Sequence, residues 1–362
     1  MAAFPEDYEM KASGLIRMWV AEGFVKSNGD KSLEDEAEDY LKSLVERNVV
    51  SVRLCNWYGK AKRYNMHDLL RDLCIGKADD EKFLHLKNSP KVRFSNQLRR
   101  VSIHTSYVLE DIDEYASSSE MSLVRSFLLV IKLDRNLSPI VFTLSLLRVL
   151  DLLEMCKIKF PEEILQLVNL CYLSINCKSL PRSGISRLCN LQTLIARLSF
   201  YSYCPVELWE MYELRHLIML GVYLRIEDDY MKKIVLKKMQ TIRGMKLNPS
   251  VIRMGFLESI PNIKNLEIFY EVEGSSGKSE VVDLSHLHKL QTLSWSSMFR
   301  QYLHGLKFPS TLRKLSIYGC VITPAVTTAL CALPNLEVLK IEGCTFKSNE
   351  TGEEAANEEW EK

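Results

Sequence analysis

Residues 160–175, FPEEILQLVNLCYLSI, join a proline-led approach to a short segment in which apolar and variable residues alternate. The centre of this stretch is Leu170-x-x-Leu173-x-Ile175, and the same spacing of apolar residues recurs eleven times between residues 98 and 342. Alternation with a period of two is typical of a strand that buries one face. Units of this kind stack their strands side by side, so the pattern predicts a curved parallel sheet in a solenoid.

The eleven copies begin 21 to 27 residues apart, which is the period of a leucine-rich repeat. Their first two apolar positions are Leu98-Val101, Val124-Phe127, Leu147-Leu150, Leu170-Leu173, Leu191-Leu194, Leu214-Leu217, Met239-Ile242, Ile263-Leu266, Leu290-Leu293, Leu312-Leu315 and Leu336-Leu339. The copies at 98, 124 and 239 match the pattern poorly, which favours an uneven arc over a regular horseshoe. We predict an α/β leucine-rich-repeat solenoid over residues 91–347.

The variable residues beside the buried strand positions project from the concave face of such an array, and they form the predicted partner-binding surface. Aromatic and arginine side chains are favoured anchors in protein interfaces, although an exposed strand also tolerates such residues singly without binding anything. The candidates are Tyr172, His216, Glu267, Phe269, Arg313, Lys314, Tyr318, Lys340 and Glu342. The surface as a whole indicates binding to a protein.

Two late repeats place a cysteine three residues past their third apolar position, at Cys320 and Cys344. The repeat takes Asn or Cys there to satisfy backbone groups of the turn or to fill it. We therefore predict a structural role for both cysteines.

The first ninety residues show apolar residues at helical spacing instead. An apolar stripe from Leu15 to Phe24 predicts a first helix, and Ser32-Leu-Glu-Asp35, which resembles a capping box, predicts the start of a second. Residues 49–54 and 62–65 lie on either side of a turn and predict a two-stranded wing, and residues 67–76 predict a third helix. This order of elements predicts a winged-helix module over residues 1–90.

Charge argues against nucleic acid as a partner. Lys plus Arg number 47 against 46 for Asp plus Glu, so no overall field draws the chain to phosphates. The predicted second helix, residues 33–47, carries more acidic than basic residues, which would repel a nucleic-acid backbone. This acidic face is expected to be solvated or docked on another domain. Residues 348–362 are also strongly acidic, have lost the repeat, and predict a disordered tail.

Other functional classes find no support in the residues. No apolar stretch approaches the length of a membrane span, and ten scattered cysteines without paired ligand spacing favour a reduced, cytoplasmic protein. Neither a metal-binding spacing nor a nucleophile motif is present, so we expect no metal site, no catalytic residue and no enzymatic activity.

Three strings of the first region resemble the plant intracellular immune receptors of the nucleotide-binding (NB-ARC), leucine-rich-repeat class. They are Phe4-Pro-Glu-Asp-Tyr8, Leu15-Ile-Arg-Met-Trp-Val-Ala-Glu-Gly-Phe24 and Tyr64-Asn-Met-His-Asp-Leu-Leu-Arg-Asp-Leu73. The sequences of these motifs most resemble those of the coiled-coil subclass, in particular its late-blight-resistance-type proteins. Together with the repeats, the resemblance covers nearly the whole chain.

The resemblance implies that His67 senses bound ADP through its β-phosphate, within a Met66-His67-Asp68 motif in which Asp68 supports the orientation of the histidine. The residues alone also allow a simpler interpretation, in which Met66 and Leu69 are core and His67 and Asp68 cap a helix. Full-length members of the family bind ADP or ATP. This chain has no Gly-x-x-x-x-Gly-Lys-Ser/Thr loop, so we expect it to bind no nucleotide alone.

The resemblance therefore implies a disease-resistance protein whose repeats recognise a pathogen effector or a guarded host protein. A nucleotide-binding domain would be a further partner in an intact relative. The missing loop indicates either a truncated gene sequence or a receptor fragment with its regulatory and sensing parts. The alternative is a free-standing repeat scaffold or decoy without switch activity.

Overall fold

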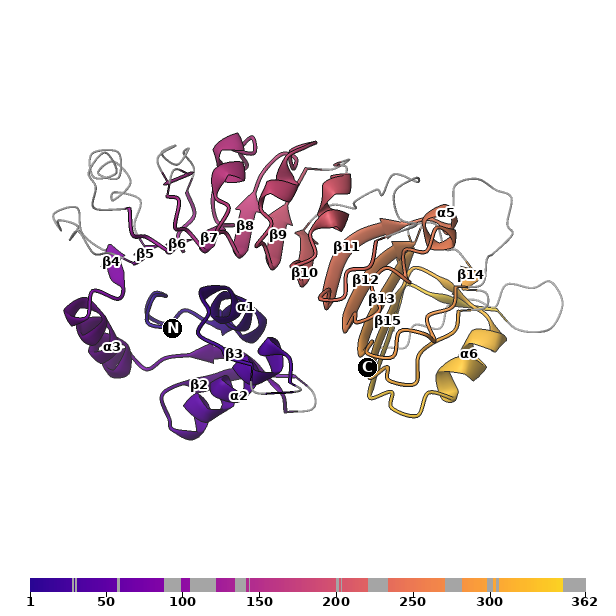
Figure 1. The fold of residues 1–362 in the computed structure, drawn as a ribbon. Helices are drawn as coiled ribbons and strands as arrows, with labels where there is room; N and C mark the ends of the chain where they lie inside the picture. The colour runs from indigo at the N-terminus through magenta and orange to yellow at the C-terminus, as the bar shows by residue number, and fades with distance from the viewer. Residues whose placement is uncertain are drawn as a thin grey trace. The chain divides into compact units, whose positions relative to one another are not determined.

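The computed structural model describes most of the chain and divides it into two units, coloured along the sequence in Figure 1. The first unit comprises Met1–Lys178 and Arg187–Ala196, and the second comprises Ser179–Ser186 and Arg197–Lys362. The described residues are 1–27, 29, 31–56, 59–87, 99–104, 122–133, 141–142, 144–199, 202, 204–220, 234–270, 282–297, 302–303 and 306–347. The predicted tail at 348–362 lies outside them.

The first unit begins with the predicted helices and wing. The elements are β1 (Met10–Lys11), α1 (Ala12–Glu22), α2 (Leu33–Glu46), β2 (Ser51–Cys55), β3 (Ala61–Asn65) and α3 (Asp68–Asp80). Strand β3 pairs antiparallel with both β1 and β2. The expected cap is present, because the Asp35 N–H donates to the Ser32 hydroxyl at 3.3 Å. Leu15, Leu41 and Met66 lie in the core that holds these elements together.

The first unit continues into parallel strands that stack as the repeat pattern predicted. They are β4 (His85–Lys87), β5 (Arg100–Ile103), β6 (Ser126–Leu129), β7 (Val149–Leu152), β8 (Tyr172–Asn176) and β9 (Thr193–Arg197), in this spatial order. The register aligns one apolar residue of each repeat in a row, Val101, Phe127, Leu150 and Leu173. Each of these residues is at most 1% exposed, so the row is a continuous core. Strand β4, which pairs with β5, was not predicted.

The second unit repeats this arrangement. Its parallel strands are β10 (His216–Leu220), β11 (Thr241–Leu247), β12 (Asn265–Tyr270), β13 (Thr292–Ser297), β15 (Lys314–Tyr318) and β17 (Val338–Glu342). A smaller parallel sheet consists of β14 (Tyr302–Leu303), β16 (Val321–Ile322) and β18 (Thr345–Phe346). Each of the eleven predicted repeats therefore contributes one strand, from β5 to β17.

Short helices lie in the segments between strands, and the first of them falls in the proline-led approach at residues 160–175. They are η4 (Glu162–Gln166), η5 (Ile185–Arg187), η6 (Val206–Glu210), α5 (Pro249–Arg253) and α6 (Pro324–Cys331). A proline stands directly before η4 and η6 and at the start of α5 and α6, where its missing N–H costs nothing because no intrahelical partner exists.

Polar side chains satisfy backbone groups between consecutive repeats. An asparagine just before the first apolar position donates its side-chain amide to a carbonyl of the preceding repeat at 2.8 to 2.9 Å. The pairs are Asn169 with Ser145, Asn190 with Val168, Asn262 with Lys237 and Asn335 with Ser310. The Cys320 N–H donates to Cys344 Sγ at 3.4 Å, and the Cys320 thiol donates to the Tyr318 carbonyl at 3.2 Å. The predicted structural role of this cysteine pair is confirmed.

Two glycines at equivalent positions of neighbouring repeats differ in their surroundings, and this difference yields a prediction. Gly319 (φ +64°) and Gly343 (φ +62°) both have left-handed backbones, but a Cβ would lie 2.4 Å from the Ser297 carbonyl oxygen at Gly319, against 3.9 Å from the nearest atom at Gly343. Gly343→Ala should lower the free energy of unfolding by about 1 kcal/mol, and Gly319→Ala by roughly 3 kcal/mol because overpacking adds to the backbone strain. Urea unfolding followed by circular dichroism measures both, and equal losses would contradict the close approach.

Candidate interaction surfaces

The carboxyl end of α1 rests against the repeat strands of the first unit. Arg148, directly before β7, donates from Nε to the Ala21 carbonyl at 3.0 Å. A Cβ on Gly23, the residue that ends α1, would lie 3.6 Å from the same guanidinium. The last carbonyls of a helix lack intrahelical partners and carry partial negative charge. Arg148 therefore attaches the helix end to the array through a charge-assisted hydrogen bond.

A buried ion pair adds a second attachment at the same helix end. Glu22 Oε2 lies 2.7 Å from Arg100 Nη2 on β5, and the two side chains are only 6% and 13% exposed. The guanidinium of Arg100 also lies 4.8 Å from the ring centre of Phe24 and 4.1 Å from that of Phe83. A charge that has lost its water is stabilised by such a partner and by aromatic faces. Removing either charge would leave the other buried and unpaired.

The first residues of the chain are held between the repeats and α3. The Ser102 hydroxyl donates to the Ala3 carbonyl at 2.6 Å, and His104 Nε2 donates to the same oxygen at 2.8 Å. On the other side, Arg71 Nε donates to the Phe4 carbonyl at 2.8 Å. The winged-helix elements thus contact the repeat strands along the N-terminal segment and at the end of α1.

Tyr172 and His216 are buried, contrary to the prediction that they face solvent. Tyr172 is 2% exposed and His216 is 5% exposed. In the first unit, α1 contacts β7 and β8 (Figure 1), so the winged-helix module covers the face on which Tyr172 lies. On β10, consecutive residues from His216 to Met219 are buried, which means that both faces of that strand are covered. Neither residue is available to a partner in this arrangement.

A half-buried carboxyl group, that of Asp151, lies beside Tyr172. Desolvation, which is the largest effect, and the nearby charge of Glu154 together raise the pKa of Asp151 on β7 to about 6, although the Leu153 N–H donates to this carboxyl at 3.3 Å. Burial and the neighbouring Asp151 likewise raise the pKa of Tyr172 and of Tyr8. The charged form of Asp151 is therefore disfavoured in the folded chain.

The Met66-His67-Asp68 motif forms the turn from β3 into α3. Met66 is 8% exposed and lies in the winged-helix core. His67 is the N-cap of α3: its Nδ1 accepts a hydrogen bond from the Leu69 N–H at 3.4 Å. Asp68 lies in the first turn, where the helix dipole favours an acid. The capping interpretation is confirmed, but Leu69 is 76% exposed and the expectation that it is core was wrong. The nucleotide-sensing role of His67 stays a prediction.

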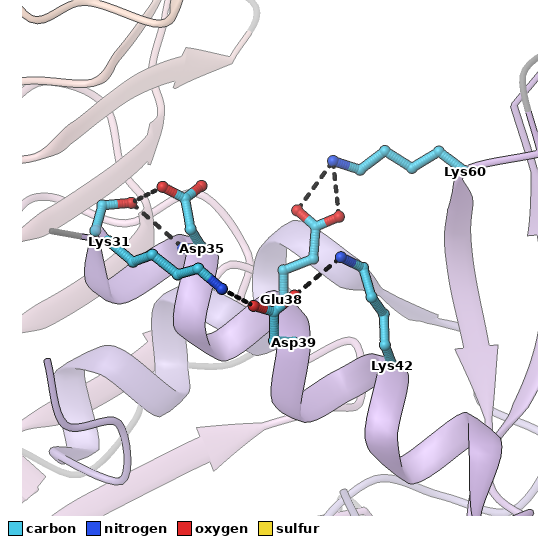
Figure 2. A network of polar contacts seen from close by, with 7 residues as sticks. Lys31, Asp35, Glu38, Asp39, Lys42 and Lys60 are labelled. Carbon is cyan, nitrogen blue, oxygen red and sulfur yellow. Dashed lines mark hydrogen bonds and ion pairs between the residues drawn. The ribbon is translucent and has the colours of Figure 1, made fainter. Parts of the chain in front are cut away.

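Figure 2 shows that lysines of the same module pair with the acidic face of α2. Asp39 lies 2.9 Å from Lys31 and 3.0 Å from Lys42, and hydrogen bonds from these two lysines lower the pKa of Asp39 to about 2. Glu38 lies 2.8 Å from Lys60. Exposed pairs of this kind contribute little to stability because water and salt screen them. These side chains are exposed or half-buried in the chain alone, and docking of this face on another domain stays a prediction.

The remaining predicted partner-binding residues belong to the second unit and are exposed or half-buried. Those on its strands gather on one surface, the outward positions of β12, β13, β15 and β17, called here the β12–β17 face. The register aligns Phe269, Ser296, Tyr318 and Glu342 in one row and Glu267, Ser294, Ser316 and Lys340 in the next. Lys314 lies two residues before Ser316, at the next outward position of β15.

Arg313 lies just before β15 and pairs with Glu337 at 3.4 Å, so it borders this face without lying on a strand. Sequence reasoning missed Arg243 on β11, which pairs with Glu267 at 2.8 Å. It also missed Ser294 and Ser296 on β13 and Ser316 on β15. All of these occupy the same alternate positions as the predicted residues, so counting every outward position would have found them.

Both parts of the chain match known protein families. Residues 3–74 match the winged-helix domain of disease resistance proteins, and residues 123–350 match a leucine-rich repeat region. Within the described residues, no helix combines the length and apolar character needed to cross a membrane, and no group of metal-binding side chains is found.

Several curated proteins are similar over nearly the whole chain. Late blight resistance protein R1-A of Solanum demissum is 29% identical over 98% of this chain and 27% of its own length. A putative late blight resistance protein homolog of the same species is 30% identical over 94% of this chain and 26% of its own length. The ToMV resistant protein Tm-2 netted virescent of Solanum lycopersicum is 26% identical over 95% of this chain and 44% of its own length. The chain thus spans about a quarter of the length of these two late blight relatives.

The partly desolvated carboxyl of Asp151 predicts a pH-dependent stability. Its folded pKa of about 6 exceeds the ordinary value of 3.8, so its favourable contribution is complete below pH 4 and is lost as pH rises through about 6. Asp151→Asn, which cannot ionise, should therefore be more stable than the parent chain at pH 8, by roughly 2 kcal/mol, and should lose this advantage near pH 4. Urea midpoints across this pH range measure the difference. A pH-independent difference would show that the carboxylate is not desolvated.

Proposed function

Because this chain belongs to the plant disease-resistance proteins that combine a winged-helix domain with leucine-rich repeats, we propose that its repeats recognise a protein partner in a defence response. The partner would be a pathogen effector or a host protein that the receptor guards. The observation that carries this proposal is the β12–β17 face, where aromatic and charged side chains remain accessible. The corresponding face of β7 and β8 is covered by α1.

The β12–β17 face has the composition of a protein-binding surface. Phe269 and Tyr318 stand two strands apart in one row with Ser296 between them, so a side chain of the partner can insert between two aromatic walls. Around them lie charges of both signs, Glu267 and Glu342 against Lys314 and Lys340. Mixed charges at the rim of an interface give specificity and orientation. Aromatic anchors that become buried on binding give most of the affinity.

The winged-helix module supports the sensing role of His67 in an intact receptor. Since Nδ1 of His67 accepts the Leu69 N–H, the neutral ring carries its proton on Nε2, which is then available to donate to a phosphate oxygen. The bound nucleotide would supply that phosphate. On the same helix, Leu69 and Leu73 are 76% and 64% exposed and lie one turn apart. They form an apolar strip suited to contact with a nucleotide-binding domain.

Substitutions on the β12–β17 face test partner recognition. Tyr318→Ala removes an aromatic anchor and should weaken binding about tenfold or more, and Lys314→Glu reverses a charge on the same strand. Lys289→Glu, an exposed residue between strands, is the matched control and should have no effect. Proximity labelling in challenged leaves identifies candidate partners, and titration of a purified candidate measures each affinity. If the face variants retain the parent affinity for every candidate, the repeats bind elsewhere.

Nucleotide binding is expected only when the upstream domain is supplied. Calorimetry of the chain with ADP should show no heat of binding at micromolar concentrations, and submicromolar affinity would overturn this expectation. When the chain is joined to the nucleotide-binding domain of a late blight relative, ADP should be retained, and His67→Ala should shorten its residence. His288→Ala, at an exposed histidine of the repeats, is the control outside the motif. An unchanged residence time in the His67 variant would contradict the sensing role.

A further inference from the structure

We propose that the first unit contains a binding site for a small, neutral, apolar molecule that carries one hydrogen-bond-accepting oxygen. A cavity of about 490 Å³ lies between the winged-helix elements and strands β5 to β7. Its walls are mainly apolar and include Met18, Trp19, Phe83, Leu84, Leu128 and Val149. Sites for drug-sized molecules have volumes of roughly 300 to 1,000 Å³ and similar apolar walls. The cavity thus has the size and lining of a ligand site.

Two neighbouring polar groups line this cavity. Arg100 on β5 and Ser126 on β6 are register partners, and both line the cavity. Ser126 is 3% exposed, and neither its Oγ nor Nε of Arg100 has a hydrogen-bond partner among the described residues. A buried polar atom without a partner costs about 1 to 3 kcal/mol, and folded proteins satisfy nearly all of them. An oxygen that accepts from Arg100 Nε–H and contacts the Ser126 hydroxyl would satisfy both.

The charge of that oxygen follows from the charged groups that line the cavity. Glu22 lies 2.7 Å from Arg100 Nη2 and balances its charge, and Lys77 and Glu81 add one charge of each sign. Burial lowers the pKa of the Met1 amino group to about 6, so this amine is mainly neutral at pH 7. A second carboxylate would be repelled by Glu22 in a poorly solvated site. A carbonyl or hydroxyl oxygen accepts a hydrogen bond without this penalty. The site therefore favours a neutral ligand over an acid of the same shape.

Such a ligand would act on the contact between the winged helix and the repeats. The walls come from α1 and α3 on one side and from β5, β6 and β7 on the other, so an occupant touches both. A molecule that binds only the docked arrangement stabilises it by RT ln(1 + [L]/Kd), so the stabilisation grows with the logarithm of its concentration above Kd. This proposal does not depend on partner recognition at the β12–β17 face, which belongs to the other unit.

A series of probes with one aromatic body tests the site. The full chain is titrated with pyrene, 1-acetylpyrene and 1-pyrenecarboxylate, which carry no oxygen, a neutral acceptor and an anion, and fluorescence is followed. We expect saturable one-to-one binding, with 1-acetylpyrene about tenfold tighter than pyrene because of one added hydrogen bond. The carboxylate should bind more weakly than the ketone. No saturable binding, or a carboxylate that binds most tightly, would overturn the proposal.

Two variants locate the bound probe. Ala78→Trp fills the cavity from α3 and should abolish binding, whereas Leu73→Trp, on the exposed side of the same helix, should leave it unchanged. Ser126→Ala removes only a hydroxyl and should reduce the tenfold preference for 1-acetylpyrene over pyrene at least threefold. Equal binding by the parent and the Ala78 variant would place the probe elsewhere, and an unchanged preference in the Ser126 variant would refute the assigned polar contact. Circular dichroism confirms that each variant is folded.

Discussion

The structure depends on one constraint: a single repeat cannot bury its own apolar strand residues and must stack on its neighbours. The row of Val101, Phe127, Leu150 and Leu173 shows this in the first unit, and the row from Leu217 to Leu315 shows it in the second. Stacking brings backbones so close that Gly319 has no room for a side chain. It also leaves turn backbone groups that asparagines and cysteines of adjacent repeats must satisfy.

Stacking creates a broad strand face, and the first unit uses part of that face internally. Two arginines directly before or at the start of repeat strands, Arg148 and Arg100, hold the end of α1 by its carbonyl and by Glu22. The face at Tyr172 is thereby covered by α1. Beside this contact, the winged-helix elements and β5 to β7 line the cavity that contains Arg100 and Ser126. In the second unit the aromatic and charged side chains at the outward positions of β12 to β17 stay exposed or half-buried. One kind of surface thus serves attachment in one unit and stays accessible in the other.

Much of this organisation followed from local patterns. The spacing of leucines predicted each repeat strand, and the Ser32 pattern predicted the start of α2, because both are effects of residues near one another in the chain. Tyr172 and Leu69 show where such reasoning failed. Tyr172 sits at an outward position but is covered by a helix distant in sequence, and Leu69 is apolar but faces away from the core.

The sequence by itself determined the repeat architecture, the winged-helix elements and the likeness to disease-resistance proteins, since periodicity, caps and motifs are written in consecutive residues. Only the tertiary structure decided which strand positions are covered, that Asp151 is desolvated, and that Arg100 and Ser126 meet in the lining of an apolar cavity. These properties arise from contacts between segments far apart in the chain. Burial and charge pairing at such contacts depend on how the segments meet, which no local pattern records.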